Sequence, residues 1–310
     1  MAIKHFLGFA DLSSAELRVL IDSARTMKEA RIKARLAKGA RDPDPVMRGY
    51  IIALVFEQPS TRTRTSFHVG IRQLGGSALT LNKNELQLGR GETIADTARV
   101  LSRYVDMIMV RTDSHSKLEE MAQFASVPVI NGLTDKGHPC QILADLMTLH
   151  ERFSSLEGKT VAWVGDCNNM CLSWIEAAEK LPFCLRIAAP KTYQPPTALI
   201  AAAQARGAKV EVFDDPKSAV AGVDCVTTDT WASMNHTDRE VRLAAFRGYQ
   251  VNEALMKLAA KNAVFLHCLP AHRGEEVTDS VIDGAQSLVW DEAENRMHGQ
   301  KAVMRWCLGL

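Results

Sequence analysis

The strongest chemical signal in the chain is a group of hydroxyl and guanidinium side chains that follows a predicted buried strand. Residues 51–56 are all apolar, Pro59 then turns the chain, and Ser60-Thr61-Arg62-Thr63 opens a helix. The first turn of a helix presents unpaired N–H groups and a partial positive charge, so it attracts anions. Arginine adds a planar fork of donors that matches phosphate oxygens. The segment therefore predicts an anion site, with a plain helix cap and surface arginines as the alternative. It lacks the glycines and the Gly-Lys-Ser/Thr ending of a P-loop.

Other polar groups also stand where predicted strands end or helices begin. His138-Pro139-Cys140-Gln141 lies at a loop-to-helix junction, and His138 can donate a hydrogen bond or a proton near neutral pH. His267-Cys268-Leu269-Pro270 follows a buried strand, where a structural cysteine is the alternative interpretation. Gly165-Asp166-Cys167-Asn168-Asn169-Met170 joins a strand to a helix without the later glycines of a dinucleotide site, and Asp229 follows another strand.

The elements that must position these residues alternate between short β-branched runs and amphipathic stretches, which is typical of a parallel α/β sheet. Strands are predicted over 51–56, 78–81, 106–111, 127–130, 161–164, 185–188, 210–213, 225–227 and 264–267. Helices are predicted from the Ser13 capping box to about Lys38, and over 60–74, 93–103, 117–124, 139–150 and 291–310.

The length of 310 residues suggests two domains, and the polar stretch 154–159 suggests where they divide. We expect a first domain over 1–150, onto which the last helix packs back, and a second over 151–310. The predicted fold is α/β, with two doubly wound parallel-sheet domains and a ligand in the cleft between them at the carboxyl ends of the strands.

Composition argues against several classes of protein. Lys and Arg number 37 against 36 Asp and Glu, whereas a nucleic-acid-binding protein usually carries a basic excess. No apolar run approaches the roughly 18 to 20 residues of a membrane span. The cysteine count of 7 is odd, without a Cys-x-x-Cys pair, which favours a reducing, cytoplasmic location. Cys167 and Cys171 are one helical turn apart but lack partners at zinc spacing, so no metal is expected.

Taken together and in order, these segments resemble the aspartate/ornithine carbamoyltransferase family along essentially the whole chain, and its ornithine-specific branch in particular. The segments that carry the resemblance are Ser60-Thr61-Arg62-Thr63, Gln87-Leu88-Gly89-Arg90-Gly91-Glu92, Asp96-Thr97-Ala98-Arg99-Val100-Leu101, Arg111, His138-Pro139-Cys140-Gln141, Gly165-Asp166, Asn168-Asn169-Met170, Asp229 with Ser233-Met234, His267-Cys268-Leu269-Pro270 and Glu294-Asn295-Arg296. The resemblance implies transfer of a carbamoyl group from carbamoyl phosphate to the δ-amine of L-ornithine, which gives citrulline and phosphate without a cofactor. Arginine biosynthesis is the expected setting.

The resemblance also implies a role for each matching residue. Catalytic roles fall to Thr63, Arg111, His138 and Cys268. Our hypothesis for Cys268 is that its thiolate, together with desolvation, favours the neutral form of the δ-amine. Residues matching carbamoyl phosphate contacts are Ser60, Thr61, Arg62, Thr63, Gln87, Arg111, His138, Pro139, Cys140, Gln141, Cys268, Leu269 and Arg296. Residues matching ornithine contacts are Asn169, Asp229, Ser233 and Met234. Because Gln87 matches a residue that reaches a neighbouring subunit, a homotrimer or a higher assembly is expected.

Several positions depart from the family pattern. Gln58 stands where lysine is frequent, Cys167 where glycine is usual, Leu172 where asparagine or histidine is found, and Asn235 where glycine follows the Ser-Met pair. The last three flank the ornithine side. The alternatives are therefore a carbamoyltransferase for putrescine, acetylated ornithine or aspartate, and a non-catalytic relative. Aspartate enzymes carry His-Pro-Leu-Pro where Cys268 stands here.

Overall fold

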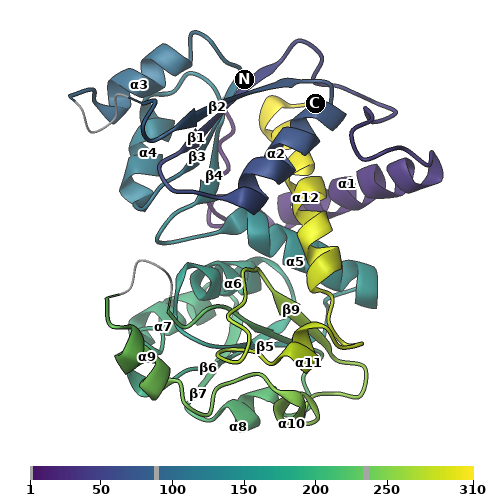
Figure 1. Cartoon of the computed structure of the whole chain (residues 1–310), viewed down its shortest axis with the longest axis vertical. Coiled ribbons are helices and arrows are strands. Elements are labelled where there is room, and N and C mark those ends of the chain that lie inside the picture. The colour runs from purple at the N-terminus through teal and green to yellow at the C-terminus, as the bar shows by residue number, and fades with distance from the viewer. Residues whose placement is uncertain (1–2, 87–90, 233–236) are drawn as a thin grey trace. The chain divides into compact units, whose positions relative to one another are not determined.

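Two compact α/β units make up the chain (Figure 1). The computed structural model describes residues 3–86, 91–232 and 237–310. One unit contains Met1–Met147 together with Glu294–Leu310, and the other contains Thr148–Ala293. Each unit has its own parallel sheet, which confirms the predicted fold class.

The sheet of the first unit has the order β2-β1-β3-β4. Its strands are β1 (Ile51–Phe56), β2 (Ser77–Asn82), β3 (Met107–Arg111) and β4 (Val129–Leu133). Strand β1 is covered on both faces, which explains its continuous apolar sequence. Phe56 pairs with Arg111, so the loop after β1 begins level with the end of β3. The strand order reverses at this point, where open α/β sheets bind their ligands.

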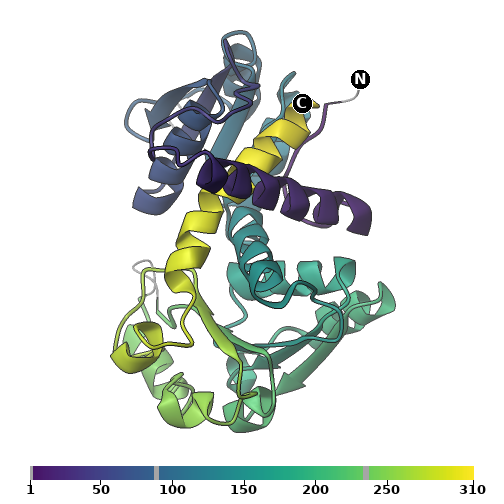
Figure 2. The ribbon, with the colours of Figure 1, turned by 90° about the vertical axis from the view of Figure 1, so that its right-hand side faces the viewer.

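Helices cover both faces of this sheet. They are α1 (Ser14–Lys33), α2 (Thr61–Gln73), α3 (Ile94–Leu101), α4 (His115–Phe124), the start of α5 (Pro139–Phe153) and most of α12 (Val289–Leu308). Helices α3 and α4 share one hydrophobic cluster with β1, β3 and β4. Helix α12 crosses α1 (Figure 2), where Lys28 Nζ donates to Asn295 Oδ1 over 2.8 Å. Gly70 lets α2 approach α12, because a Cβ there would lie 3.2 Å from Lys301 Cγ.

Helix α1 begins as predicted and ends earlier. The capping box between Ser13 and Glu16 is present, but the helix stops at Lys33 and not near Lys38. Arg35 adopts a φ of 50°, and the Arg31 guanidinium donates to the carbonyls of Ala37, Lys38 and Ala40. These bonds favour a compact turn over further helix, and the same guanidinium pairs with buried Asp42 at 2.5 Å.

The sheet of the second unit has the order β7-β6-β5-β8-β9. Its strands are β5 (Thr160–Val164), β6 (Cys184–Ala188), β7 (Lys209–Phe213), β8 (Cys225–Thr228) and β9 (Val264–His267). Its helices are α6 (Asn169–Lys180), α7 (Thr197–Ala205), α8 (Pro216–Val220), α9 (Arg239–Ala245), α10 (Glu253–Met256) and α11 (Asp279–Ile282), with a 3-10 turn at Lys191–Tyr193. Because β5, β8 and β9 are neighbours, the segments that follow them meet at one edge of the sheet.

A helix that crosses a membrane needs about 20 predominantly apolar residues. None of the helices within 3–86, 91–232 and 237–310 is both long enough and apolar enough to cross a bilayer.

Candidate active site

The start of α2 presents the first group of predicted residues. Ser60 is the N-cap, and its Oγ accepts a hydrogen bond from the Thr63 amide at 3.2 Å. Thr61 is the first helical residue and is exposed, Arg62 is half-buried, and Thr63 is 1% exposed. The helix thus turns hydroxyl groups and amides toward the carboxyl edge of the sheet, as anion binding requires.

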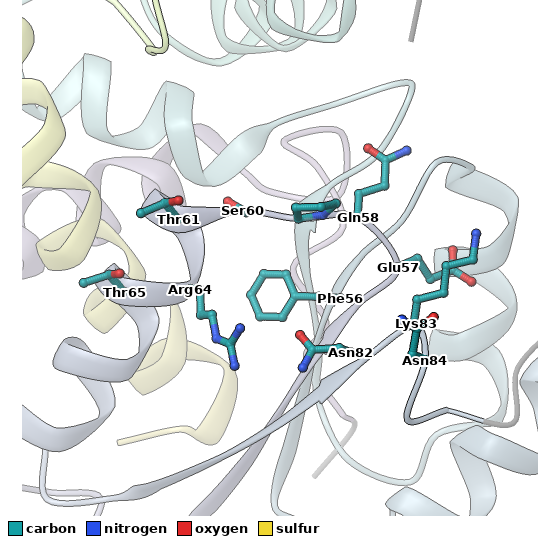
Figure 3. Close-up of a pocket in the computed structure, with 11 residues that line it drawn as sticks. Phe56, Glu57, Gln58, Ser60, Thr61, Arg64, Thr65, Asn82, Lys83 and Asn84 are labelled. Atoms are coloured by element: carbon teal, nitrogen blue, oxygen red, sulfur yellow. The ribbon is translucent and has the colours of Figure 1, made fainter. Parts of the chain in front are cut away.

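A pocket of about 560 Å3 opens beside this helix start (Figure 3). Figure 3 shows Arg64 and Asn82 on one side of the Phe56 ring and Ser60 and Thr61 on the other. The lining residues are Phe56, Glu57, Gln58, Pro59, Ser60, Thr61, Arg64, Thr65, Asn82, Lys83 and Asn84. Two of the predicted residues, Ser60 and Thr61, therefore face this pocket, and two cationic side chains, Arg64 and Lys83, accompany them.

Thr63 lies at the centre of a buried network of guanidinium groups. Its Oγ1 accepts hydrogen bonds from Arg296 Nη2 at 2.8 Å and from Arg111 Nη1 at 3.4 Å. Arg296 Nη1 also donates to Gln141 Oε1 at 2.6 Å, and Gln141 Nε2 donates to Asp145 Oδ1 at 2.8 Å. The first unit thus brings together Thr63, Arg111, Gln141 and Arg296, which come from four different elements.

His138 is buried beside the same arginines. Burial holds the pKa of His138 well below its usual range, and the charges of Arg296, Arg111 and Arg62 lower it further. The imidazole is therefore neutral at pH 7, so it can donate a hydrogen bond but carries no charge. Three guanidinium groups acting on one buried ring also mean that the local field attracts anions.

Pro139 and Cys140 start helix α5. Pro139 is its first residue, where a missing amide hydrogen costs nothing. Burial raises the pKa of the Cys140 thiol to about 12, and its Sγ donates to the Asn131 carbonyl at 3.4 Å. Its thiol group is thus protonated and engaged in the core, and its backbone is what it can offer a ligand.

The second unit gathers Asn168, Asp229 and Cys268 at the edge of its sheet. Asn168 Nδ2 donates to Asp229 Oδ2 at 2.8 Å, and Cys268 Sγ donates to Asp229 Oδ1 at 3.2 Å. Asn168 also caps α6, because its Oδ1 accepts from the amides of Met170 and Cys171. Asn169 is the half-buried residue that follows. In this arrangement the Cys268 thiol and the Asn168 amide group each donate to one oxygen of Asp229.

His267 shapes the loop that carries Cys268 and Leu269. Its Nδ1 accepts from the Leu269 amide at 2.8 Å, which places the ring proton on Nε2, and Nε2 faces Glu276 Oε1 at 3.2 Å. The His267 amide donates to Glu292 Oε2 at 2.9 Å. These contacts hold Leu269 at a φ of 56°, a conformation that is uncommon for a residue other than glycine and is found at functional sites.

Two groups of side chains bring potential metal ligands close together. Asp229, His267 and Cys268 offer donors within 4.8 Å of one another, as do His272, Glu275 and Glu276. In the first set both ring nitrogens of His267 are engaged by Leu269 and Glu276, so neither has a lone pair for a metal. In the second set Glu275 forms an ion pair with Arg239, which reduces the charge available to a cation.

Three residues that contact the site were not predicted from the sequence, and three predicted residues are not described by the structure. The contacts of Asp145, Glu276 and Glu292 were not expected. Only the contact of Asp145 had a sequence signal, because Gln141 and Asp145 are one helical turn apart. The predicted residues Gln87, Ser233 and Met234 lie outside the described part of the chain.

Comparisons with known proteins agree with one another. Residues 4–151 match the family model for the carbamoyl-P binding domain of aspartate/ornithine carbamoyltransferase, and residues 157–307 match that for its Asp/Orn binding domain. An ornithine carbamoyltransferase of Nitrobacter winogradskyi is 53% identical over 308 residues, which cover 99% of this chain and 98% of that protein. One from Rhizorhabdus wittichii is 54% identical, with 99% and 98% covered.

Solved structures give the same result. Ornithine carbamoyltransferase from Pyrococcus furiosus superposes with a TM-score of 0.92 at 46% identity, covering 98% of this chain and 96% of that one. The anabolic enzyme from Campylobacter jejuni superposes with a TM-score of 0.90 at 37% identity, covering 99% of each. The chain belongs to the aspartate/ornithine carbamoyltransferase family.

Proposed function

We propose that this protein is an ornithine carbamoyltransferase, which transfers the carbamoyl group of carbamoyl phosphate to the δ-amine of L-ornithine and releases L-citrulline and phosphate. The observation that carries the proposal is the buried cationic cluster of the first unit. There, Arg62, Arg111 and Arg296 act on neutral His138, and two of these arginines share the hydroxyl of Thr63. Such a cluster suits a small, doubly charged acyl phosphate.

In this proposal, the phosphate group binds at the start of α2. Ser60, Thr61, Arg62 and Thr63 supply hydroxyl groups, amides and a guanidinium, and the helix dipole adds to the attraction. Ser60 Oγ caps the Thr63 amide. A phosphate oxygen is a stronger acceptor than this hydroxyl, so it competes for the same amide.

The carbamoyl carbonyl is then polarised by Thr63, Arg111 and His138. Thr63 Oγ1 already accepts from two guanidinium groups, so its own hydrogen is left to donate to the substrate oxygen. Neutral His138 donates in the same sense. One such donor aimed at a developing oxyanion contributes about 3 kcal/mol. Pro139, Cys140 and Gln141 lie beside the carbamoyl amide.

Ornithine binds in the second unit in this proposal. Asp229 offers a carboxylate to the α-ammonium group, and Asn169 lies at the start of α6. Cys268 and Leu269 are held by the His267 loop. Ser233 and Met234 are assigned to the same site from the family motif. The thiol of Cys268 already donates to Asp229, so the geometry favours a neutral donor there over a thiolate.

The chemistry needs no cofactor, because phosphate is already a good leaving group. The δ-nitrogen lone pair forms a bond to the carbonyl carbon, and the carbonyl electrons move onto the oxygen held by the three donors. The oxyanion then collapses, the bond between carbon and the phosphate oxygen breaks, and phosphate leaves with the electron pair. Phosphate also takes the proton that the nitrogen loses. Holding the two reactants in place supplies several kcal/mol.

The test offers ornithine, aspartate and putrescine in parallel with carbamoyl phosphate, to the wild type, Arg62→Ala and Arg72→Ala. Arg72 is the matched control, since it is exposed at the far end of α2 and donates to the Gly39 carbonyl. We expect carbamoylation of ornithine alone, lost in Arg62→Ala and kept in Arg72→Ala. Carbamoylation of another amine would overturn the substrate assignment, and inactivity with all three would favour a non-catalytic relative.

We further propose that the chain acts as a homotrimer in the cytoplasm, in arginine biosynthesis, with Gln87 completing the site of a neighbouring subunit. The anabolic relative from Campylobacter jejuni supports the biosynthetic direction. Light scattering of the purified protein tests the trimer. Mixing inactive Gln87→Ala and Arg62→Ala subunits tests the shared site. Hybrid trimers regain some intact sites only if each site combines Arg62 of one subunit with Gln87 of its neighbour.

A further inference from the structure

Two thiol groups meet at the start of helix α6. Cys167 immediately precedes the N-cap Asn168, and Cys171 lies in the first turn. The Cys171 thiol donates a hydrogen bond to the Cys167 sulfur. Cys167 is half-exposed, whereas Cys171 is 0% exposed. Cys167 is therefore partly open to solvent, and Cys171 is buried.

The backbone around both residues is held by hydrogen bonds. The Cys167 amide donates to the Tyr193 carbonyl at 3.0 Å. Asn168 Oδ1 accepts from the Cys171 amide at 3.2 Å and from the Met170 amide at 2.9 Å. The helix cap thus holds the backbone of both cysteines in place.

The environment divides two chemical roles between the thiols. The hydrogen bond from Cys171 lowers the pKa of Cys167, despite partial burial and the charge of Asp166. Burial raises the pKa of Cys171 well above its usual range. The accessible sulfur is the better nucleophile, and the buried one is protonated and in position to react second. This is the arrangement of a peroxidatic and a resolving thiol.

We propose that Cys167 and Cys171 form a redox-active dithiol that closes to a disulfide on reaction with hydrogen peroxide. The Cys167 sulfur attacks the peroxide oxygen, the O–O bond breaks, and a sulfenic acid and one water form. The Cys171 sulfur then attacks the sulfenic sulfur, and hydroxide leaves as the second water. The two thiols lose two electrons and two protons in total, and the peroxide gains them.

The disulfide is expected to disturb the ornithine side of the site, a consequence that rests on the proposed function. A disulfide brings its sulfurs to about 2.05 Å, closer than a hydrogen bond between thiols allows. Asn168 lies between the two cysteines, and its Nδ2 donates to Asp229 Oδ2 at 2.8 Å. Contraction of this turn weakens that bond and shifts the carboxylate. We expect the KM for ornithine to rise about tenfold, as for one lost hydrogen bond to a charged group.

The experiment treats the reduced protein with stoichiometric hydrogen peroxide and maps its thiols by mass spectrometry before and after dithiothreitol. We expect a reversible loss of two hydrogen atoms from the peptide that contains both cysteines. Cys171→Ser is expected to stop at a sulfenic acid on Cys167, which dimedone traps, and Cys167→Ser to form neither product. Cys184→Ser is the matched control, because Cys184 is also half-exposed but burial raises its pKa.

The outcomes separate the inference from the proposed function. Oxidation that maps to Cys184 or Cys268 in place of this pair overturns the dithiol, and so does equal peroxide inactivation of wild type and Cys167→Ser. A disulfide at this pair that leaves the KM for ornithine unchanged overturns the coupling to the site. Mapping needs no turnover, so a reduced protein that makes no citrulline overturns the proposed function while leaving the thiol result standing.

Discussion

Replacement of Thr63 by valine tests the donor network directly. Valine keeps the shape of the buried side chain but removes the hydroxyl that accepts from Arg296 at 2.8 Å and from Arg111 at 3.4 Å. The substrate oxygen then loses one donor, which corresponds to about 3 kcal/mol, or roughly a hundredfold in kcat. Arg296 Nη2 also loses an acceptor in a buried position, which is expected to lower the free energy of unfolding by about 1 to 3 kcal/mol.

The assay is citrulline formation at saturating substrates, well below the melting temperature of each variant. Thr63→Ser is the control, because serine keeps the hydroxyl and loses one methyl group. We expect Thr63→Ser to keep most of the activity and Thr63→Val to lose about 99% of it. A kcat of Thr63→Val within about threefold of wild type, or an equally large loss in Thr63→Ser, would refute the donor role of the hydroxyl.

Further predictions concern the groups around the site. Glu276→Leu leaves the His267 Nε2–H and the His272 amide without their buried acceptor, so the urea midpoint and the kcat of this variant should fall. Glu276→Gln should recover both values. Unchanged values in Glu276→Leu would refute the positioning role. Because the folded pKa of His138 lies below the unfolded value, unfolding free energy should be greatest above pH 6.5 and decline as pH falls through the folded pKa. Imidazole nitrogen NMR should find His138 neutral from pH 8 to about 6.5, and a midpoint near 6.5 or higher would contradict this. Lys301→Met removes a fully buried ammonium that pairs with Asp42 at 2.8 Å and should lower the free energy of unfolding by about 3 kcal/mol. Lys33→Met, at an exposed position of α1, should lower it little. Equal losses in the two variants would exclude the buried pair as the cause.

Local sequence signals predicted much of the fold. The continuous apolar run of β1 and the capping box at Ser13 each depend on neighbours in the chain, and the structure confirms both. The early end of α1 could not be predicted in this way. It depends on Arg31, whose guanidinium binds carbonyls beyond the helix and the carboxylate of Asp42.

The same distinction between local and long-range signals applies to the site residues. The start of α2 carries its helix cap and its arginines in one short segment, so the sequence predicts it. Asn168 and Asp229 are 61 residues apart, and Thr63 and Arg296 are 233 apart. Pairing over such distances is decided by the order of the strands and the packing of the helices, which local patterns do not specify. Glu276 and Glu292 were not predicted because they hold the loop through His267 and belong to no recognised motif.

The most direct test of the central claim follows the carbon that is transferred. Carbamoyl phosphate labelled with 13C in its carbonyl group is incubated with the purified chain and an equimolar mixture of ornithine and aspartate, and the products are resolved by carbon NMR. We expect the label in the ureido carbon of citrulline, with one phosphate released for each citrulline. Label in carbamoylaspartate, or in bicarbonate alone, would contradict it.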